Sequence, residues 1–153
     1  MPRIETHLTA EGAEFLVLGQ LLIRDILAFK AYTKMASYDV FATNPKLETF
    51  ARISVKSCWR NKEKSFLIKS TDCEFVVVVK LNRGSKKGNA DPKEPEIFVI
   101  PAKDISGLIK NTGIKKVYFS DILGLEEKYQ NKWERICDYL AESRSPSNPK
   151  NAS

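Results

Sequence analysis

The spacing of hydrophobic and polar residues predicts alternating helices and strands. A leucine-rich segment from Ala10 to about Phe29 has a helical composition, and Thr9 stands where an N-cap is expected. Strict alternation of apolar and polar residues over residues 50–58 is typical of a strand with one buried face. The β-branched run CEFVVVVKL, residues 73–81, is typical of a strand that is buried on both faces.

The rest of the pattern completes a mixed α/β domain. Further strands are expected at residues 38–42, 97–100 and 116–119, and further helices at residues 102–110 and 126–142. The closing helix has an apolar stripe in which Trp133 is expected to anchor the core. The order αββββαβα predicts a single central mixed β-sheet flanked by helices, in one domain of residues 1–142. Residues 143–153, SRSPSNPKNAS, are almost without apolar side chains and predict a disordered tail.

Composition and charge narrow the function classes. The chain has 153 residues and a formal net charge of +6, which favours a polyanionic partner, although surface solubility explains the excess equally well. No apolar run is long enough to span a membrane, and the acidic N-terminal segment does not resemble a signal peptide, so a cytoplasmic location and no membrane partner are expected. One histidine and three scattered cysteines suggest neither a histidine-rich metal site nor a disulfide framework.

A long polar loop, residues 82–96 (NRGSKKGNADPKEPE), separates two predicted strands. Loops of this length are uncommon unless they are functional or mobile. The loop is either a simple connection or a contact with a nucleic-acid backbone through Arg83, Lys86 and Lys87.

Three polar placements break the apolar-inside rule. Glu14 has apolar neighbours one and two helical turns away, and Asp39 stands inside a short strand. On the strand of residues 50–58, Arg52, Ser54 and Lys56 share one face because side chains alternate. Each placement has an ordinary alternative, namely a helix acid reaching solvent, an aspartate at a sheet edge, and a solvated strand face.

These residues would form a hydrolytic site if the two strands brought Asp39 and Lys56 together. The Asp39 carboxylate and the Val55 backbone carbonyl are oxygen ligands suited to Mg²⁺, and Glu14 would reach the same ion or its water. A bound Mg²⁺ polarises a phosphate and lowers the pKa of a bound water. Lys56 would orient that water or neutralise charge on the phosphate. Such a constellation is suited to phosphodiester hydrolysis.

The order of Glu14, Asp39 and the triplet at residues 54–56, followed by a β-branched strand, resembles the PD-(D/E)XK nuclease superfamily. Within it the chain is similar to small Holliday-junction-resolvase-like members and to cyanobacterial group I intron homing endonucleases. The resemblance implies a restriction-endonuclease-like fold and a Mg²⁺- or Mn²⁺-dependent endonuclease that binds double-stranded DNA as a homodimer. It makes Asp39 a metal ligand, Lys56 the catalytic lysine and Glu14 the supporting carboxylate.

Ser54 departs from the motif, since the superfamily has an acid or a glutamine at this place. A hydroxyl is a weaker ligand and adds no negative charge, so metal affinity should fall. The protein is then either inactive or borrows another acid, for which Glu48 and Glu74 are the candidates. The leading hypothesis is therefore a Mg²⁺-dependent DNA endonuclease, with Arg52 among its DNA-binding cations. The alternative is a catalytically degenerate DNA-binding or partner-binding protein of the same fold. A third possibility, a hydrolase using Ser54 and Lys56, is disfavoured because strand geometry sets these side chains about 7 Å apart.

Overall fold

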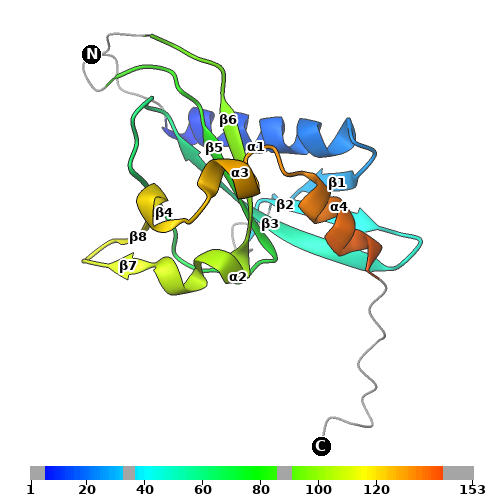
Figure 1. The fold of residues 1–153 in the computed structure, drawn as a ribbon. Helices are drawn as coiled ribbons and strands as arrows, with labels where there is room; N and C mark the ends of the chain where they lie inside the picture. Colours follow the sequence, from blue (N-terminus) through cyan, green and yellow to red (C-terminus); the bar gives the residue numbers. More distant parts are fainter. Residues whose placement is uncertain (1–5, 33–36, 86–90, 143–153) are drawn as a thin grey trace, which may run out of the picture.

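The computed structural model describes residues 6–32, 37–85 and 91–142, which form two β-sheets and four α-helices (Figure 1). The central sheet has the strand order β1 (Leu27–Lys30), β2 (Val40–Asn44), β3 (Thr49–Cys58), β5 (Phe75–Lys80), β6 (Glu96–Pro101). A smaller sheet has the order β4 (Ser65–Leu67), β8 (Lys115–Tyr118), β7 (Lys110–Asn111). The helices are α1 (Thr6–Leu22), α2 (Ala102–Ile105), α3 (Leu125–Tyr129) and α4 (Glu134–Ala141), with 3₁₀ turns at Ser106–Leu108 and Phe119–Asp121.

The central sheet is mixed, as the sequence predicts. Strands β3 and β5 run parallel, with Ile53 paired to Phe75, whereas the other neighbours in this sheet pair antiparallel. Helices α1 and α4 pack on one face of this sheet, and the small sheet packs with α2 and α3 on the other. The fold is therefore a mixed α/β domain with helices flanking a five-stranded sheet.

Strand β5 separates two hydrophobic cores. Val77 and Val79 belong to the core under α1 and α4, and Val76 and Val78 belong to the core under the small sheet. All four side chains are fully buried, which confirms the prediction of a strand buried on both faces. Trp133 is also buried and lies in the first core, as expected.

The first helix differs from its prediction at both ends. It begins at Thr6, so Thr9 lies inside it and is not the N-cap, and it ends at Leu22 well before Phe29. The chain reverses at Asp25, whose φ of 60° is a left-handed conformation that aspartate tolerates better than most residues. The reversal turns residues 27–30 into an additional strand, which pairs with β2. Composition favoured a helix here, but pairing with the sheet decided the outcome.

The second half of the chain is more segmented than expected. The closing helix is broken into α3 and α4 by Asn131, which has a φ of 54° and donates its backbone N–H to the carbonyl of Ile97 at 2.8 Å. The helix expected at residues 102–110 ends after α2 and one 3₁₀ turn. The strand expected at residues 116–119 pairs in the small sheet, together with β4, which was not predicted.

Other expectations have a mixed outcome. Residues 143–153, the predicted tail, lie outside the described residues. Cys58 and Cys73 are buried free thiols and Cys137 is an exposed one. Within the described ranges, no helix combines the length and apolar character needed to cross a membrane.

Candidate functional site

Asp39 stands immediately before β2 and is fixed against β3. Its backbone N–H donates to the carbonyl of Ile53 at 2.9 Å, and its Oδ2 accepts the backbone N–H of Val55 at 2.7 Å. Val55 lies beyond Ile53, the last residue of β3 that pairs with β2. The carboxylate therefore satisfies a strand amide that β2 no longer reaches, since a backbone N–H left without a partner in this part-buried place is costly. This contact holds the carboxylate over the middle of β3.

A pocket of about 360 Å³ opens beside Asp39. The described residues lining it are mostly polar or cationic, and they come from β3, from the chain before β2 and from the segment around β4: Ser37, Asp39, Ser54, Lys56, Leu67, Lys69 and Ser70. Two lysines, three serines and one aspartate give this lining a formal charge of +1. Ammonium and hydroxyl groups donate hydrogen bonds to anions, so the lining suits an anionic group such as a phosphate.

The structure brings three of the predicted residues, Asp39, Ser54 and Lys56, to this one pocket. Ser54 and Lys56 share a face of β3, and Ser54 is nearly buried, with 3% of its surface exposed. Lys56 is half-buried, and the structure shows no ion pair for it among the described residues. Its ammonium group is therefore available to a ligand. Val55 lies on the same strand, but its contact with Asp39 is through the amide and not through the predicted carbonyl.

Glu14 is not among the described residues that line this pocket, although it lies close enough to interact electrostatically with Asp39. Its Oε2 forms an ion pair with Lys30 Nζ at 3.1 Å, and Lys30 also binds the Glu11 carboxylate. Burial raises the pKa of Glu14; the Lys30 hydrogen bond opposes this rise and the Asp39 charge adds to it. Burial alone would lower the pKa of Lys30, but its hydrogen bonds to Glu11 and Glu14 raise it. The Glu14 carboxylate is therefore already paired with a cationic side chain of the protein, Lys30.

Neither acid considered as a substitute for the motif acid is brought to the pocket. Glu48 is exposed in the turn between β2 and β3, at the opposite end of that hairpin from Asp39. Glu74 is bound by Arg52, whose Nη2 lies 2.8 Å from Glu74 Oε1 and whose backbone N–H donates to Oε2 at 2.6 Å. Neither candidate acid therefore lines the pocket that holds Asp39, Ser54 and Lys56.

The cations proposed for DNA contact are dispersed. Arg52 is engaged by Glu74 and also by Asp72, whose Oδ1 lies 3.4 Å from Arg52 Nη1. Arg83 is exposed on the loop after β5, where its backbone N–H donates to the carbonyl of Trp59. Lys86 and Lys87 lie outside the described residues.

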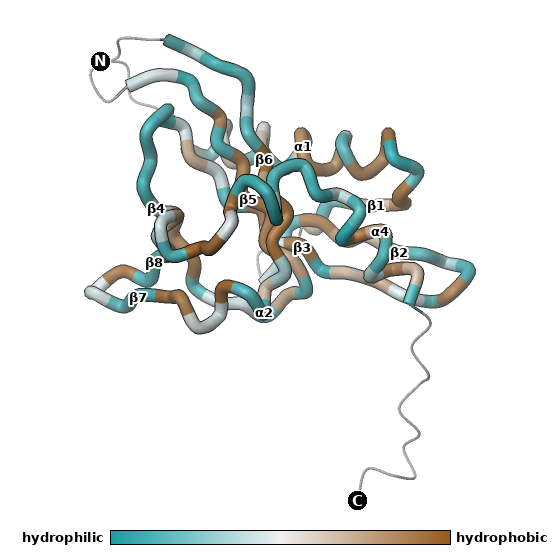
Figure 2. Tube along the Cα trace, in the orientation of Figure 1, coloured by the Kyte–Doolittle hydropathy of each residue, from teal (hydrophilic) through white to brown (hydrophobic). Residues whose placement is uncertain are grey.

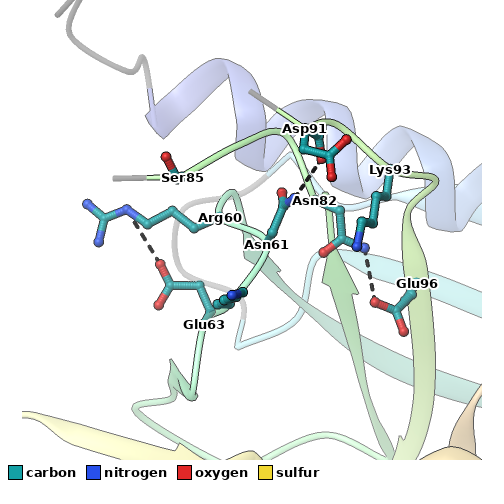
Figure 3. A pocket seen from close by; sticks show the side chains of 9 residues that line it. Arg60, Asn61, Glu63, Asn82, Ser85, Asp91, Lys93 and Glu96 are labelled. Carbon is teal, nitrogen blue, oxygen red and sulfur yellow. Dashed lines mark hydrogen bonds and ion pairs between the residues drawn. The ribbon is translucent and has the colours of Figure 1, made fainter. Parts of the chain in front are cut away.

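A larger pocket, of about 630 Å³, lies where the loops after β3 and β5 meet (Figure 3). Its polar side chains are largely occupied by one another and by backbone. Asn61 donates to the Asp91 carbonyl at 2.7 Å, Asn82 donates to Glu96 Oε1 at 3.0 Å, and Arg60 lies 3.8 Å from Glu63. Among the described lining residues three cations balance three acids, so this pocket has no net charge with which to attract an ion.

Comparison with known proteins supports the fold. The chain is similar to a solved structure entitled "The structure of a bacterial homing endonuclease: I-Ssp6803I". The match has a TM-score of 0.59 at 14% identity and covers 93% of this chain and 100% of that one. No protein-family model matches the chain, and no curated protein does so. At this identity the likeness shows an endonuclease-like fold and nothing about catalysis.

The donors for a divalent ion are few. Among the described residues, no group of three histidine, cysteine, aspartate or glutamate side chains is placed to hold a metal. Asp39 has one oxygen engaged by Val55 and Glu14 is paired with Lys30. Mg²⁺ sites in proteins often use one or two carboxylates completed by water and substrate phosphate. The donor set fits an ion of that kind, held jointly with a substrate, and does not form an all-protein cage.

Sequence reasoning missed two lysines that shape the site. Lys69 lines the pocket from the segment after β4, a strand too short to show a periodic pattern. Lys30 directly follows the expected helix of Ala10 to about Phe29, and it instead ends β1 and binds Glu14. The only sequence signal for either was the general excess of basic residues.

Proposed function

We propose that this chain binds double-stranded DNA and hydrolyses its phosphodiester bonds in a reaction that depends on Mg²⁺ or Mn²⁺. One observation carries the proposal: Asp39, Ser54 and Lys56 line one pocket, in a fold similar to that of a homing endonuclease. The net charge of +6 supports a polyanionic substrate. A homodimer would present one such pocket to each strand of the duplex.

The pocket would receive a single backbone phosphate. Lys56 and Lys69 would attract its charge, and the Ser54 hydroxyl would donate to one of its oxygens. Lys56 is the residue of this set that also stabilises the negative charge developing on the phosphoryl oxygens during hydrolysis. Its ammonium group is suited to that role because it has no carboxylate ion-pair partner among the described residues.

Asp39 would hold the divalent ion together with the phosphate, and Glu14 would join it only by releasing Lys30. When bound, such an ion supplies a Lewis acid for the phosphate and a water of lowered pKa. The hydrogen bond from the Val55 amide fixes the orientation of the Asp39 carboxylate in advance. A carboxylate that is already oriented loses little freedom when it binds a ligand.

The test is cleavage of duplex and branched DNA with and without Mg²⁺ or Mn²⁺. We expect metal-dependent cutting, and we expect Asp39→Asn and Lys56→Ala each to slow it about 100-fold or more, the usual cost of removing one catalytic group. Lys46→Ala, in the turn at the far end of the β2–β3 hairpin, removes the same charge and serves as the control. Cutting that survives both pocket substitutions would show that this pocket is not the catalytic site.

A second candidate function is DNA binding without cleavage. Two features favour it: Ser54 stands in place of the motif acid, and Glu14 is already paired with Lys30. In that case the lysines of the pocket would bind the DNA backbone with an affinity that falls as salt rises, and no metal would be required. Calorimetry with Mg²⁺ and Mn²⁺ in the presence of uncleavable DNA separates the two. Metal binding that disappears in Asp39→Asn would exclude the non-catalytic reading.

A further inference from the structure

Helix α1 has a second apolar stripe on the side that faces away from the core. Four large side chains of α1, and that of Ile23 directly after it, are exposed to between 39% and 73%: Leu8, Phe15, Leu16, Leu22 and Ile23. Gly12 and Gly19 lie within the same stripe, and a Cβ added at either position would meet no atom within 4 Å. The hydropathy-coloured trace shows α1 as largely hydrophobic, with the helix at the outside of the fold (Figure 2).

The stripe is continuous along the helix. At about 100° per residue, its seven positions fall within roughly 120° of the helix circumference. The fully buried residues Ala13, Val17 and Leu21 occupy the opposite side. A second apolar stripe is unusual in a helix of a soluble protein, because the side that faces away from the core is normally polar. Among the described residues, the core packs against the opposite side of α1, and Lys30 Nζ lies 4.3 Å from the centre of the Phe15 ring at one edge of the stripe.

Six of the seven positions of the stripe form pairs about the point midway between Phe15 and Leu16. Moving outward from that point, the first pair is Phe15 with Leu16 and the second is Gly12 with Gly19. The third pair, Leu8 with Ile23, is of two aliphatic residues of equal size. Leu22 has no apolar equivalent, because the matching position is Thr9. A two-fold axis through that point would bring Gly12 of one copy opposite Gly19 of a second copy, with apolar side chains on both sides of the two glycines.

The size of the stripe agrees with such an interface. Its exposed apolar surface is about 500 Å², at the upper end of what a monomer commonly shows in one patch. Two copies together would bury about 1,000 Å², the size at which specific interfaces begin. The glycine pair would allow the two helix backbones to approach closely beside the axis, so the large side chains on either side of it would interlock.

We propose that this stripe is the surface through which two copies of the chain associate, with their α1 helices antiparallel. Phe15 and Leu16 lie at the two-fold axis, and Gly12 of one copy faces Gly19 of the other. The assembly is independent of any nuclease chemistry.

The first test is the mass of the full chain in solution, measured by sedimentation over a range of concentrations. We expect a dimer for the unmodified chain and at least a 10-fold weaker dimer for Leu16→Glu. Leu123→Glu is the matched control, because Leu123 is also an exposed leucine, at 80%, and lies away from α1. A monomeric unmodified chain, or a Leu16→Glu dimer as tight as the control, would overturn the proposal.

The second test reads the geometry and does not depend on weakening the dimer. In a Cys137→Ser background, which removes the exposed thiol, Gly12→Cys combined with Gly19→Cys is expected to form covalent dimers under mild oxidation. Neither single cysteine is expected to do so, because equivalent positions in the two copies lie about 10 Å apart along an antiparallel helix pair. The same spacing prevents a bridge within one helix. Efficient dimers from either single cysteine would contradict the antiparallel arrangement.

Discussion

Arg52 and Lys56 lie four residues apart on the same face of β3, but their surroundings differ. Arg52 is held by Glu74 and Asp72, and Glu74 also accepts its backbone N–H. Lys56 faces a pocket whose only acid among the described lining residues is Asp39, and that acid is bound to the Val55 amide. Sequence alternation places both cations on one face, but only the structure shows that one is already paired.

The difference teaches how to separate a structural cation from a functional one. The free energy of a half-buried, hydrogen-bonded ion pair appears in the stability of the fold, and such a pair has no capacity left for a ligand. A cation that lines a polar pocket and has no ion pair contributes little to stability and can still bind an anion. Variants that remove each partner should therefore affect different measurements, and the following predictions use this contrast.

The largest effect is expected at Glu74. Glu74→Ala should lower the free energy of unfolding by about 2 kcal/mol, because it leaves the half-buried guanidinium of Arg52 and its amide without their partner. Lys56→Ala should change the same quantity by less than about 0.5 kcal/mol. Urea unfolding of both variants measures the difference. Equal losses would show that Lys56 also has a structural role.

An intermediate effect is expected at Lys69. Lys69→Ala should weaken DNA binding about 5-fold and reduce the slope of log affinity against log salt by about 1, the loss of one phosphate contact. Arg52→Gln should leave the slope unchanged, since its charge is already neutralised within the protein. Fluorescence anisotropy at several salt concentrations reads both numbers. A slope that falls for Arg52→Gln and not for Lys69→Ala would reverse the assignment.

The smallest effect is in the pH dependence of stability. Burial of Glu74 opposes its ionisation, but the hydrogen bonds from the Arg52 side chain and amide outweigh burial and lower its pKa below the ordinary value of 4.5. The stability from this pair is therefore fully present above about pH 4.5 and is lost as the pH falls through the lowered value. Glu74→Gln should flatten the unfolding free energy across that acid range by less than about 1 kcal/mol. A profile identical to that of the unmodified chain would contradict the shift.

Much of the fold was accessible from sequence because burial leaves a strong signal. The alternation along β3 and the valine run of β5 predicted the central strands to within two residues. The failures occur where local composition and tertiary pairing conflict. Residues 27–29 have a helical composition, yet the reversal at Asp25 sends them into the sheet.

The candidate site was partly predictable for the same reason. Alternation puts Ser54 and Lys56 on one face, and the order of the strands places Asp39 near them. The pairs of Glu14 with Lys30 and of Arg52 with Glu74 join residues separated by 16 and 22 positions. Nothing in the local pattern of a single sequence indicates which distant charge will meet which.

The left-handed conformation of Asn131 has one more consequence. By interrupting the closing helix it brings extended backbone alongside β6, where Gln130 bridges to Phe98 and the Asn131 amide bonds to Ile97. The outer edge of β6 is thereby partly covered. A strand from another molecule would have to displace these hydrogen bonds in order to pair with β6. The opposite edge strand, β1, has no such covering segment within the described residues. Pairing with strands of other molecules, and fibril growth from it, are therefore expected to start at β1.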